Sequence, residues 1–404
     1  MPAPQFADPA PPILTIDPFS PECLNDPYPA HERLRDAGPV VWLERYGVWA
    51  VGRHAEVKSV LSNWQTFCSS AGVGLSNYRR ETPWRPPGLL LEADPPIHNR
   101  ARSVLTKILS PPAIKALKTQ FEVEAVRLVD ELVARGSFDA ITDLAEAFPI
   151  KVFSDAIGLP LRGRDKLLPY GKLIFNAFGP RNALFLEAMA EAEHFQDWVA
   201  ESCSRGALTP GMLGAQIYAA ADAGEIALDE APRLVRAFIS AGLDTTVSAL
   251  GNAIYLFGLF PEQWALLRDD PALARGAFEE VLRYEAPFQT FFRTSTEQTE
   301  IAGQTIGADE KIMVSVGSAN RDPRQWQNPD QFDIKRRALG HVGMGVGIHA
   351  CVGQMIARLE GEVVLSALAR RVRTIEITGT PERRLNNTLR GLKSLPVSLR
   401  TIEH

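Results

Sequence analysis

The stretch GHVGMGVGIHACVGQMIARLE, residues 340–360, places Cys351 between a glycine-rich loop and a run of helix-forming residues. Gly343, Gly345 and Gly347 precede the cysteine, and Gly353 follows it. The residues after Gly353 combine good helix formers with the apolar spacing of a helix. The pattern therefore predicts a sulfur atom at a helix N-terminus, where backbone N–H groups and the helix dipole favour a thiolate.

Three uses of this thiol follow from the residues alone. It is an inert buried cysteine, a nucleophile with His341 or His349 as its base, or a metal ligand. The glycines favour the third use, because they let the backbone approach a flat, bulky group and aim amides at the sulfur. The other cysteines lie far apart without CxxC spacing, which excludes a disulfide framework and a structural zinc site.

Composition limits the classes of function. The chain has 404 residues, 45% of them hydrophobic, which is enough for a large core. A net charge of -5 and the lack of a basic block exclude nucleic-acid binding. The first 30 residues are rich in proline and acid and lack an apolar stretch, so we expect no signal peptide or membrane anchor and a cytoplasmic protein.

Periodicity predicts a mainly α fold with small β-sheets. Residues 40–53 alternate around Tyr46 and Gly47, as in a β-hairpin. Helical spacing dominates from about residue 97 to 282, for instance from 113 to a stop at Gly136. Alternation returns at 299–316 and 373–378. No repeat or linker divides the sequence, so residues 1–404 are expected to form one domain, with a smaller β-rich region near the N-terminus and a larger helical region.

One helix is predicted to cross the core. It would begin at Asp229 as N-cap, with Pro232 in its first turn, and end before Pro261. In its middle, Gly242 lowers helix propensity, and Asp244 and the two threonines after it compete for backbone carbonyls. This segment is either a tolerated irregularity or a local opening that holds water and relays protons.

The segment GMGVGIHACVG, residues 343–353, resembles the haem-binding loop of the cytochrome P450 (haem-thiolate monooxygenase) family. That loop reads aromatic-Gly-x-Gly-x-basic-x-Cys-x-Gly, and here Met344 stands where the family usually has phenylalanine, which bears on redox tuning. The resemblance implies haem b as cofactor, Cys351 as the iron ligand, and Gly345 and Gly353 in the cofactor loop. It also implies the family's fold, a triangular prism with a long central helix over the haem.

Further motifs follow in the family's order. AGLDTT, residues 241–246, is similar to the oxygen-activation motif and implies Asp244 and Thr245 as a catalytic acid–alcohol pair. EEVLRYEAP, residues 279–287, supplies Glu280 and Arg283, which in the family are buried and brace the cysteine loop. The third arm of that brace is usually an arginine where this chain has Gln331, and Arg336 is the nearest replacement.

Two more segments match the positions that hold the haem propionates. DPPIHNRAR, residues 94–102, supplies His98 and Arg102, and FFRT, residues 291–294, supplies Arg293. Together with His349 these groups would pair two otherwise buried carboxylates.

The resemblance implies a reaction with O2 in which the cysteine thiolate favours O–O cleavage. Two electrons must come from separate partners, because the chain carries no flavin or iron–sulfur motif. We expect an iron–sulfur ferredoxin and its reductase, docking near a basic group of residues on the cysteine side, and a monomeric enzyme. That group is Lys107, Lys335, Arg336 and Arg337, and a solvated face explains it equally well. A non-oxygenating haem-thiolate sensor and a thiol hydrolase are the rival classes.

The substrate is suggested by the lid segment FCSSAGVGLSNYRRETPWRPPGLLLEADPP, residues 67–96, with FNAFGP at 175–180 and QTFFRT at 289–294. These resemble the bacterial group that oxidises para-substituted benzoic acids, including O-demethylation of 4-methoxybenzoate. In that group an arginine at the position of Arg85 captures the substrate carboxylate. The resemblance implies substrate contacts from Arg85, Phe175, Phe178, Ala237, Ala241, Phe288 and Phe291.

This chain departs from that group at three positions. Gly88 and Ala237 stand where the group has serine partners for the carboxylate, and the bulky Phe288 replaces a smaller aliphatic residue. Two lost hydroxyl donors would cost about 1–3 kcal/mol each unless Arg236, Ser240 or water replaces them. An aromatic carboxylic acid remains the leading substrate, and another small hydrophobic molecule is the alternative.

Overall fold

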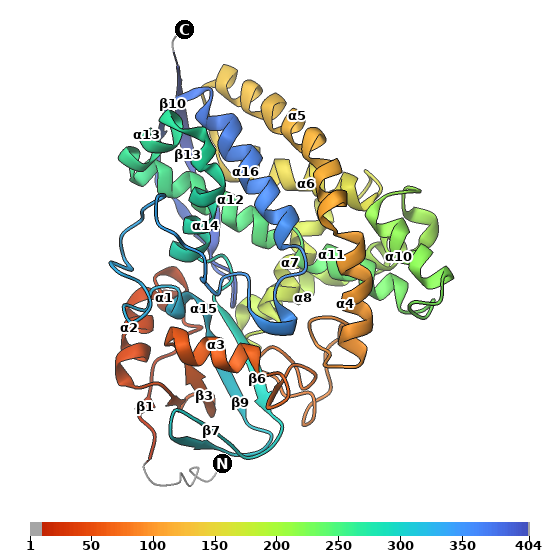
Figure 1. Cartoon of the computed structure of the whole chain (residues 1–404), viewed down its shortest axis with the longest axis vertical. Helices are drawn as coiled ribbons and strands as arrows, with labels where there is room; N and C mark the ends of the chain where they lie inside the picture. The colour runs from red at the N-terminus through yellow and green to blue at the C-terminus, as the bar shows by residue number, and fades with distance from the viewer. Residues whose placement is uncertain (1–9, 403–404) are drawn as a thin grey trace.

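A computed structural model describes residues 10–402, apart from the side chain of Glu193 (Figure 1). The first nine residues of the proline-rich lead lie outside this range. The longer helices are α2 Tyr28–Ala37, α3 His54–Ser62, α4 Ile97–Ile108, α5 Pro111–Arg135, α6 Ala147–Ile157, α7 Leu167–Asn176, α8 Ala183–Ala192, α10 Leu213–Asp222, α11 Ala231–Ala241, α12 Asp244–Leu259, α13 Pro261–Asp269, α14 Ala274–Tyr284 and α16 Gln354–Ala369. Shorter helical segments are α1 Pro21–Asn25, α9 Gln196–Ser202, α15 Val316–Ala319, η1 Ile141–Glu146, η2 Arg164–Lys166, η3 Glu193–Phe195, η4 Arg205–Ala207, η5 Pro271–Leu273 and η6 Gly347–His349.

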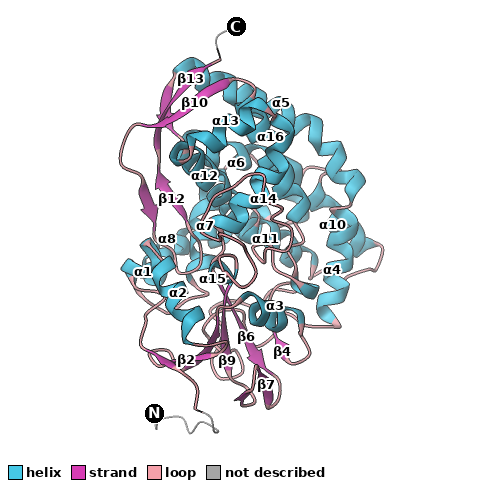
Figure 2. Cartoon of the chain, turned by 60° about the vertical axis from the view of Figure 1, so that its left-hand side comes forward, coloured by secondary structure: helices cyan, strands magenta, loops and turns pink. Residues whose placement is uncertain are grey.

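Strands gather along one side and the base of the molecule, as Figure 2 shows. They are β1 Ile13–Leu14, β2 Val41–Leu43, β3 Val48–Val51, β4 Phe67–Cys68, β5 Ser137–Asp139, β6 Thr290–Ser295, β7 Thr299–Ile301, β8 Gln304–Ile306, β9 Lys311–Ser315, β10 Val372–Ile377, β11 Glu382–Arg384, β12 Gly391–Ser394 and β13 Pro396–Thr401. The largest sheet has the order β1-β2-β3-β9-β6-β4. The prediction of a mainly helical chain with small sheets is confirmed.

The predicted hairpin is β2 and β3, which pair antiparallel with Trp42 opposite Trp49. Gly47 has a φ of 61° in its turn, a conformation that glycine adopts without strain. Strand β3 then pairs in parallel with β9, and β9 pairs antiparallel with β6. This sheet thereby joins the start of the chain to the segment that carries Arg293.

Helices α14 and α16 pack beside α12, and α5 packs on α16, which together form the large helical core (Figure 1). The 25-residue α5 buries Phe121, Leu128 and Leu132 on one face and ends before Gly136, whose φ is 77°. Both features agree with the predicted stripe and stop. Phe278 of α14 lies against Gly361 of α16, where a Cβ would come within 2.4 Å of the ring, so these two helices approach closely.

The predicted core helix is two helices, α11 and α12, separated by Gly242 and Leu243. The helix is irregular at this segment, as predicted, and the prediction of continuous helix across it is wrong; a role of the break in holding water and relaying protons stays a prediction. Glu230, not Asp229, occupies the N-cap position of α11, and Pro232 lies in the first turn as expected. Gly242 cannot carry a side chain, because a Cβ there would lie 2.2 Å from the ring of Phe153.

No single helix within residues 10–402 is both long and apolar enough to span a membrane. Residues 231–259 and helix α13 together are long and apolar enough by length and composition alone, but the chain bends by 106° between them.

Candidate active site

A cavity lies between the loop that ends in Cys351 and the break between α11 and α12. Its lining atoms surround about 1040 Å³, part of which is open to solvent. The walls are mostly apolar. Most of the predicted site residues line it: His98, Arg102, Phe175, Ala241, Thr245, Phe288, Phe291, Gly345, His349 and Cys351.

The cysteine loop is fixed by its own backbone. The N–H of Cys351 donates to the carbonyl of Met344 at 2.8 Å, which closes the loop. Gly345 and Gly347 have φ values of 67° and 71°, and a Cβ on Gly347 would lie 3.0 Å from the Cα of Ser62 in α3. These glycines are required by the loop conformation and by packing on α3, in addition to any approach to a ligand.

Burial sets the electrostatics of Cys351. Burial raises the pKa of its thiol, while the Gly353 N–H and the guanidinium groups of Arg102 and Arg358 act in the opposite direction. Helix α16 begins at Gln354, so the sulfur lies directly before its N-terminus as predicted, where the N-cap amide of Gly353 reaches it. A coordinating metal removes the proton of a thiol outright, so this sulfur suits a metal ligand.

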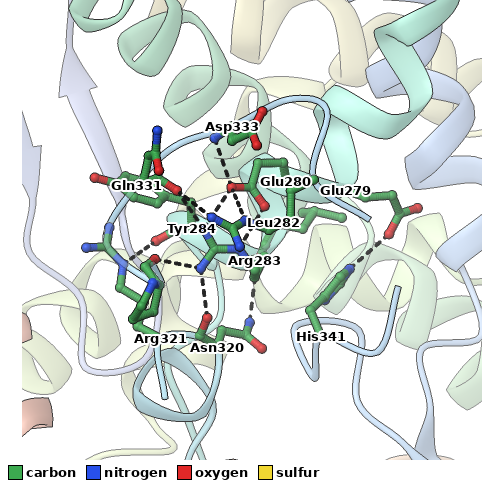
Figure 3. Close-up of polar contacts among 12 residues, drawn as sticks. Glu279, Glu280, Leu282, Arg283, Tyr284, Asn320, Arg321, Gln331, Asp333 and His341 are labelled. Atoms are coloured by element: carbon green, nitrogen blue, oxygen red, sulfur yellow. Dashed lines mark hydrogen bonds and ion pairs between the residues drawn. The ribbon is translucent and has the colours of Figure 1, made fainter. Parts of the chain in front are cut away.

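A buried ionic network lies behind the loop (Figure 3). Arg283 and Glu280 of α14 are fully buried and pair at 2.7 Å. Arg283 also donates to the carbonyls of Asn320 and Gln331, at 3.0 and 3.2 Å. Arg336 supplies the third arm, with its Nε 3.1 Å from Glu280 Oε1, as the sequence predicted. Because both charges are paired and hydrogen-bonded, the network holds the segment before Cys351 in place.

A second anchor ties α14 to the loop and to α16. Glu279 accepts a hydrogen bond from His341 at 2.9 Å and pairs with Arg358 of α16. These contacts lower the pKa of Glu279 against the effect of burial, to about 2. His341 is thereby engaged away from the thiol. No hydrogen bond joins either His341 or His349 to Cys351 within the described residues, so the geometry of a thiol hydrolase is not present.

Three basic side chains, His98, Arg102 and His349, line the cavity, and Arg293 lies close enough to act on the pKa of His349. The rings of His98 and His349 lie 4.5 Å apart, and the Nε2 atom of each is buried without a hydrogen-bond partner among residues 10–402. Arg102 donates to the Ala350 carbonyl at 2.5 Å. Arg293 is buried, which lowers its pKa to about 10, and donates to the Phe292 carbonyl.

One carboxylate lies near this cluster. Asp94 Oδ1 is 3.6 Å from His349 Nε2, too far for a hydrogen bond, and Asp94 is held by the N–H groups of Ser69 and Ser70. The cluster therefore keeps excess positive charge and unpaired nitrogens in a buried place. A flat group that carries two carboxylates, beside a thiol, satisfies them; haem b has this chemistry.

The two residues of the predicted acid–alcohol pair point to different places. Thr245 lines the cavity, and its hydroxyl donates to the Ala241 carbonyl at 3.1 Å. Asp244 does not line the cavity. Its Oδ2 lies against Gly171 of α7, where a Cβ would come within 1.7 Å of the oxygen.

Burial raises the pKa of Asp244 to about 7. The positive charge of Arg384 lowers it and the negative charge of Glu146 raises it, and these two residues pair with each other. Asp244 therefore exchanges a proton near neutral pH, which suits a relay acid.

Four phenylalanines form an aromatic cluster over the cavity. Phe288 stacks on Phe291 with ring centroids 3.9 Å apart and an interplanar angle of 20°. Phe175 meets Phe288 edge-on at 5.8 Å, and Phe178 lies 6.5 Å from Phe288. Phe178 contacts the cavity wall without lining the cavity itself. The side chain of Phe288 thus fills a slot between other rings, as its bulk suggested.

Arg85 lies outside this cavity. Its guanidinium pairs with the buried carboxylate of Glu92 at 3.1 Å and lies 5.5 Å from the ring of Trp84. Glu92 also accepts from the Gly88 N–H at 2.6 Å and from the Tyr78 hydroxyl at 3.0 Å. The group predicted to capture a substrate carboxylate is thus neutralised by a carboxylate of the lid.

The neighbouring departures also lie beside the cavity rather than in it. Ala237 does not line the cavity, and the Ser240 hydroxyl donates to the Arg236 carbonyl of its own helix at 2.7 Å. Arg79 and Arg80 are exposed and pair with Asp309, which agrees with a solvated face.

Several functional candidates were missed from the sequence. Leu90, Leu91, Thr246 and Ala249 line the cavity, and Glu92 neutralises Arg85. The apolar run GLLLE in the lid was the available signal for the leucines. The sequence does not mark the Glu92 pairing, although its partners Tyr78, Arg85 and Gly88 all lie within the lid segment.

Comparison with known proteins agrees with this geometry. The family model described as Cytochrome P450 matches residues 211–399. The chain is 57% identical over 389 residues to cytochrome P450 CYP199A2 of Rhodopseudomonas palustris, which covers 96% of this chain and 94% of that protein. It is 30% identical to the cytochrome P450 monooxygenase PikC of Streptomyces venezuelae, over 97% of this chain and 95% of that protein.

Solved structures agree as well. The cytochrome P450 CREJ in complex with (4-ethylphenyl) dihydrogen phosphate superposes with a TM-score of 0.86 at 26% identity, over 95% of this chain and 99% of that one. Cytochrome P450 CYP109Q5 from Chondromyces apiculatus gives 0.81 at 28% identity, over 96% and 99%. This chain therefore belongs to the cytochrome P450 family, as a monooxygenase whose cofactor is haem b bound through a cysteine thiolate.

Proposed function

We propose that this monooxygenase oxidises aromatic carboxylic acids with a para substituent, by O-demethylation or hydroxylation, with Cys351 as the iron ligand. The apolar cavity beneath the cluster of Phe175, Phe288 and Phe291 is the observation that carries this proposal. Its walls suit an aromatic ring, and the arginines around the lid suit an acid. The similar CREJ structure was solved with an aromatic phosphate, and an arene that carries an anion is the same kind of ligand.

Haem b, when bound, supplies the activation of O2. The chain's own residues would hold the cofactor, transfer protons and orient the substrate. His98, Arg102, Arg293 and His349 would hold the propionates, and the buried Glu280–Arg283 pair would keep Cys351 in position.

Thr245 presents a hydroxyl to the cavity next to the helix break, where it can pass a proton inward. Asp244, on the α7 side of α12, would reload Thr245, because its carboxyl holds and releases a proton near pH 7. The apolar walls exclude water and orient the substrate ring.

Electrons would come from an iron–sulfur ferredoxin and its reductase. Of the basic residues suggested for docking, Lys335 and Arg337 are exposed. Arg336 is engaged with Glu280, and Lys107 pairs with Glu225 at 2.6 Å. The docking face on this proposal depends mainly on Lys335 and Arg337, and their exchange for glutamine should slow electron transfer most at low salt.

The substrate class can be tested by the spin state of the ferric haem. We expect 4-methoxybenzoate to shift it towards high spin, and the neutral isostere 4-methoxybenzamide to produce a much smaller shift at the same concentration. An equal shift with both compounds would contradict the requirement for a carboxylate.

The alternative, another small hydrophobic substrate, has one observation in its favour. Phe288 stacks on Phe291 in the cavity wall and takes up space there, and Arg85 is already paired with Glu92. Exchange of Phe288 for valine separates the two cases. If the enzyme oxidises benzoic acids, the variant should accept larger para substituents; if it does not, the variant should gain no response to any acid.

A further inference from the structure

A second hollow lies outside the haem cavity, and it contains a cluster of arginines. It is lined by the lid residues Trp84, Arg85 and Pro86, by Tyr170 and Leu173 of α7, by α9, and by Arg233 and Arg236 of α11, around about 970 Å³ that is partly open to solvent. We refer to it as the arginine groove.

The arginine groove and the haem cavity share three walls. The lid contributes residues 84–86 to the groove and Leu90 and Leu91 to the cavity. Helix α7 contributes Tyr170 to the groove and Phe175 to the cavity, and α11 contributes Arg236 and then Ala241. A molecule in the groove is therefore separated from the cavity by about one helical turn of α7 and α11 and by the lid residues 87–89.

The groove carries uncompensated positive charge. Three guanidinium groups line it, from Arg85, Arg233 and Arg236, and among the described residues only that of Arg85 forms an ion pair, with the buried carboxylate of Glu92. Glu230 also acts on Arg233, but it is paired with Arg100 at 2.5 Å. Burial, Arg85 and Arg233 lower the pKa of Arg236, which shows that these cations repel one another.

The arginine donors also lack partners. The Nε atoms of Arg85 and Arg233 are buried without a hydrogen-bond partner among the described residues. Arg233 and Arg236 otherwise donate only to the carbonyls of Pro87 and Pro86, at 2.8 and 3.3 Å. Neutral carbonyls do not offset a cation as an anion does, so an anion with two oxygens would relieve both deficits.

Aromatic rings border these cations. Trp84 lies beside Arg85, and Tyr170 lies on the α7 wall. A ring attached to an anionic group would thus find apolar surface and charge in the same hollow.

We propose that the arginine groove is an outer binding site for aromatic carboxylates, from which they pass beneath the lid to the haem cavity. This inference rests on the proposed function for its ligand class, but it concerns a separate site that acts before the haem is reached. Arg233 and Arg236 are specificity residues on this proposal, because they concentrate acids at the lid and leave neutral arenes unaffected.

The test separates the two sites by blocking the inner one. In the holoenzyme, 4-phenylimidazole coordinates the iron and fills the haem cavity. Isothermal titration of this complex with 4-methoxybenzoate should then detect one further molecule, and titration with 4-methoxybenzamide should detect none. The doubly substituted Arg233→Gln, Arg236→Gln enzyme should bind the acid at least tenfold more weakly.

Arg127→Gln is the matched control, because Arg127 is an exposed arginine of α5 that pairs with Glu124 and Glu131. It removes one charge and should leave the titration unchanged. Folding of every variant is checked by haem content and by the reduced carbonyl spectrum. An unchanged affinity in the double variant, equal binding of the amide, or an equal loss in Arg127→Gln would overturn the groove proposal.

A kinetic measurement completes the design. Without the inhibitor, the association rate of 4-methoxybenzoate, followed by the ferric spin shift, should fall about tenfold in the double variant and lose most of its salt dependence. Groove binding without any spin shift would contradict the proposed substrate class and leave the groove in place. A spin shift without groove binding would do the reverse.

Discussion

The two sides of the haem cavity differ in whether their buried charged groups are paired within the chain. On the cysteine side, Glu280, Arg283 and Arg336 are buried and paired within the chain. On the lid side, Arg85 and Arg233 keep buried nitrogens without partners, and Asp244 is buried without an ion pair among the described residues. Buried charges that are paired and hydrogen-bonded fix the geometry of the loop, whereas buried polar groups without partners are available to a ligand or a proton. The contrast indicates a braced cysteine loop opposite a side whose unpaired groups handle substrate and protons, and the unpartnered Nε2 atoms of His98 and His349 are left for the cofactor.

The strongest way to break this comparison is to remove the sulfur. Cys351→Ser should abolish the thiolate-type carbonyl absorption of the reduced protein and all monooxygenase activity, since an alcohol does not replace the thiolate. Cys23→Ser, which changes a thiol near the N-terminus, should keep both properties. A thiolate-type spectrum that survives in Cys351→Ser would contradict the assignment of the whole cysteine side.

The next largest effect concerns the buried brace. Glu280→Gln leaves the fully buried Arg283 with an uncharged partner, and breaking such a pair costs roughly 3–5 kcal/mol of unfolding free energy. Denaturant titration and haem retention should both report the loss. The exposed Glu131→Gln on α5 should cost at most about 1 kcal/mol. Equal losses in the two variants would show that the cysteine side is no more rigid than the surface.

On the lid side, Thr245→Ala should keep haem and substrate binding but divert electrons to peroxide. The fraction of electrons that reaches product should fall several-fold, because the hydroxyl that faces the cavity is lost. Thr246→Val changes the adjacent threonine, which also lines the cavity and whose hydroxyl is directed to the Gly242 carbonyl, so it tests whether the effect is specific to Thr245. Product and peroxide yields per NADH consumed measure both variants. Unchanged coupling in Thr245→Ala would remove this residue from the relay.

The smallest effect is one of pH. Burial raises the pKa of Asp244 to about 7, so its carboxyl holds a proton below that pH and loses it above. If Asp244 delivers this proton, coupling should be full at pH 6 and should decline as the pH rises through about 7. Asp244→Asn should have low coupling that no longer depends on pH in this range. The same decline in both enzymes would assign the titration to another group.

The sequence predicted best what local patterns determine. The hairpin at Gly47, the stripe and stop of α5, and the brace that includes Arg336 follow from residues close together in the chain or from the order of the family's motifs. The pattern around Gly242 also indicated an irregular segment. It did not indicate that the helix divides in two, nor that the ring of Phe153 fills the space beside Gly242.

Side-chain pairings within loops could not be predicted from the sequence. Arg85 was expected in the cavity, and the structure turns it to Glu92 because the lid folds so that Gly88 and Tyr78 also contact that carboxylate. The thiolate expected for Cys351 agrees with the haem-thiolate cofactor of the family. The burial that raises the pKa of the free thiol is a property of the assembled core, which the sequence does not show.

The space at Gly171 has a consequence of its own. The carboxyl of Asp244 occupies the volume that a single methyl group on α7 would take. Because Gly171 has no side chain, the carboxyl of Asp244 can lie against α7. Alanine at position 171 would displace that carboxyl. On the proposed relay, Gly171 thus fixes the position from which Asp244 would supply a proton.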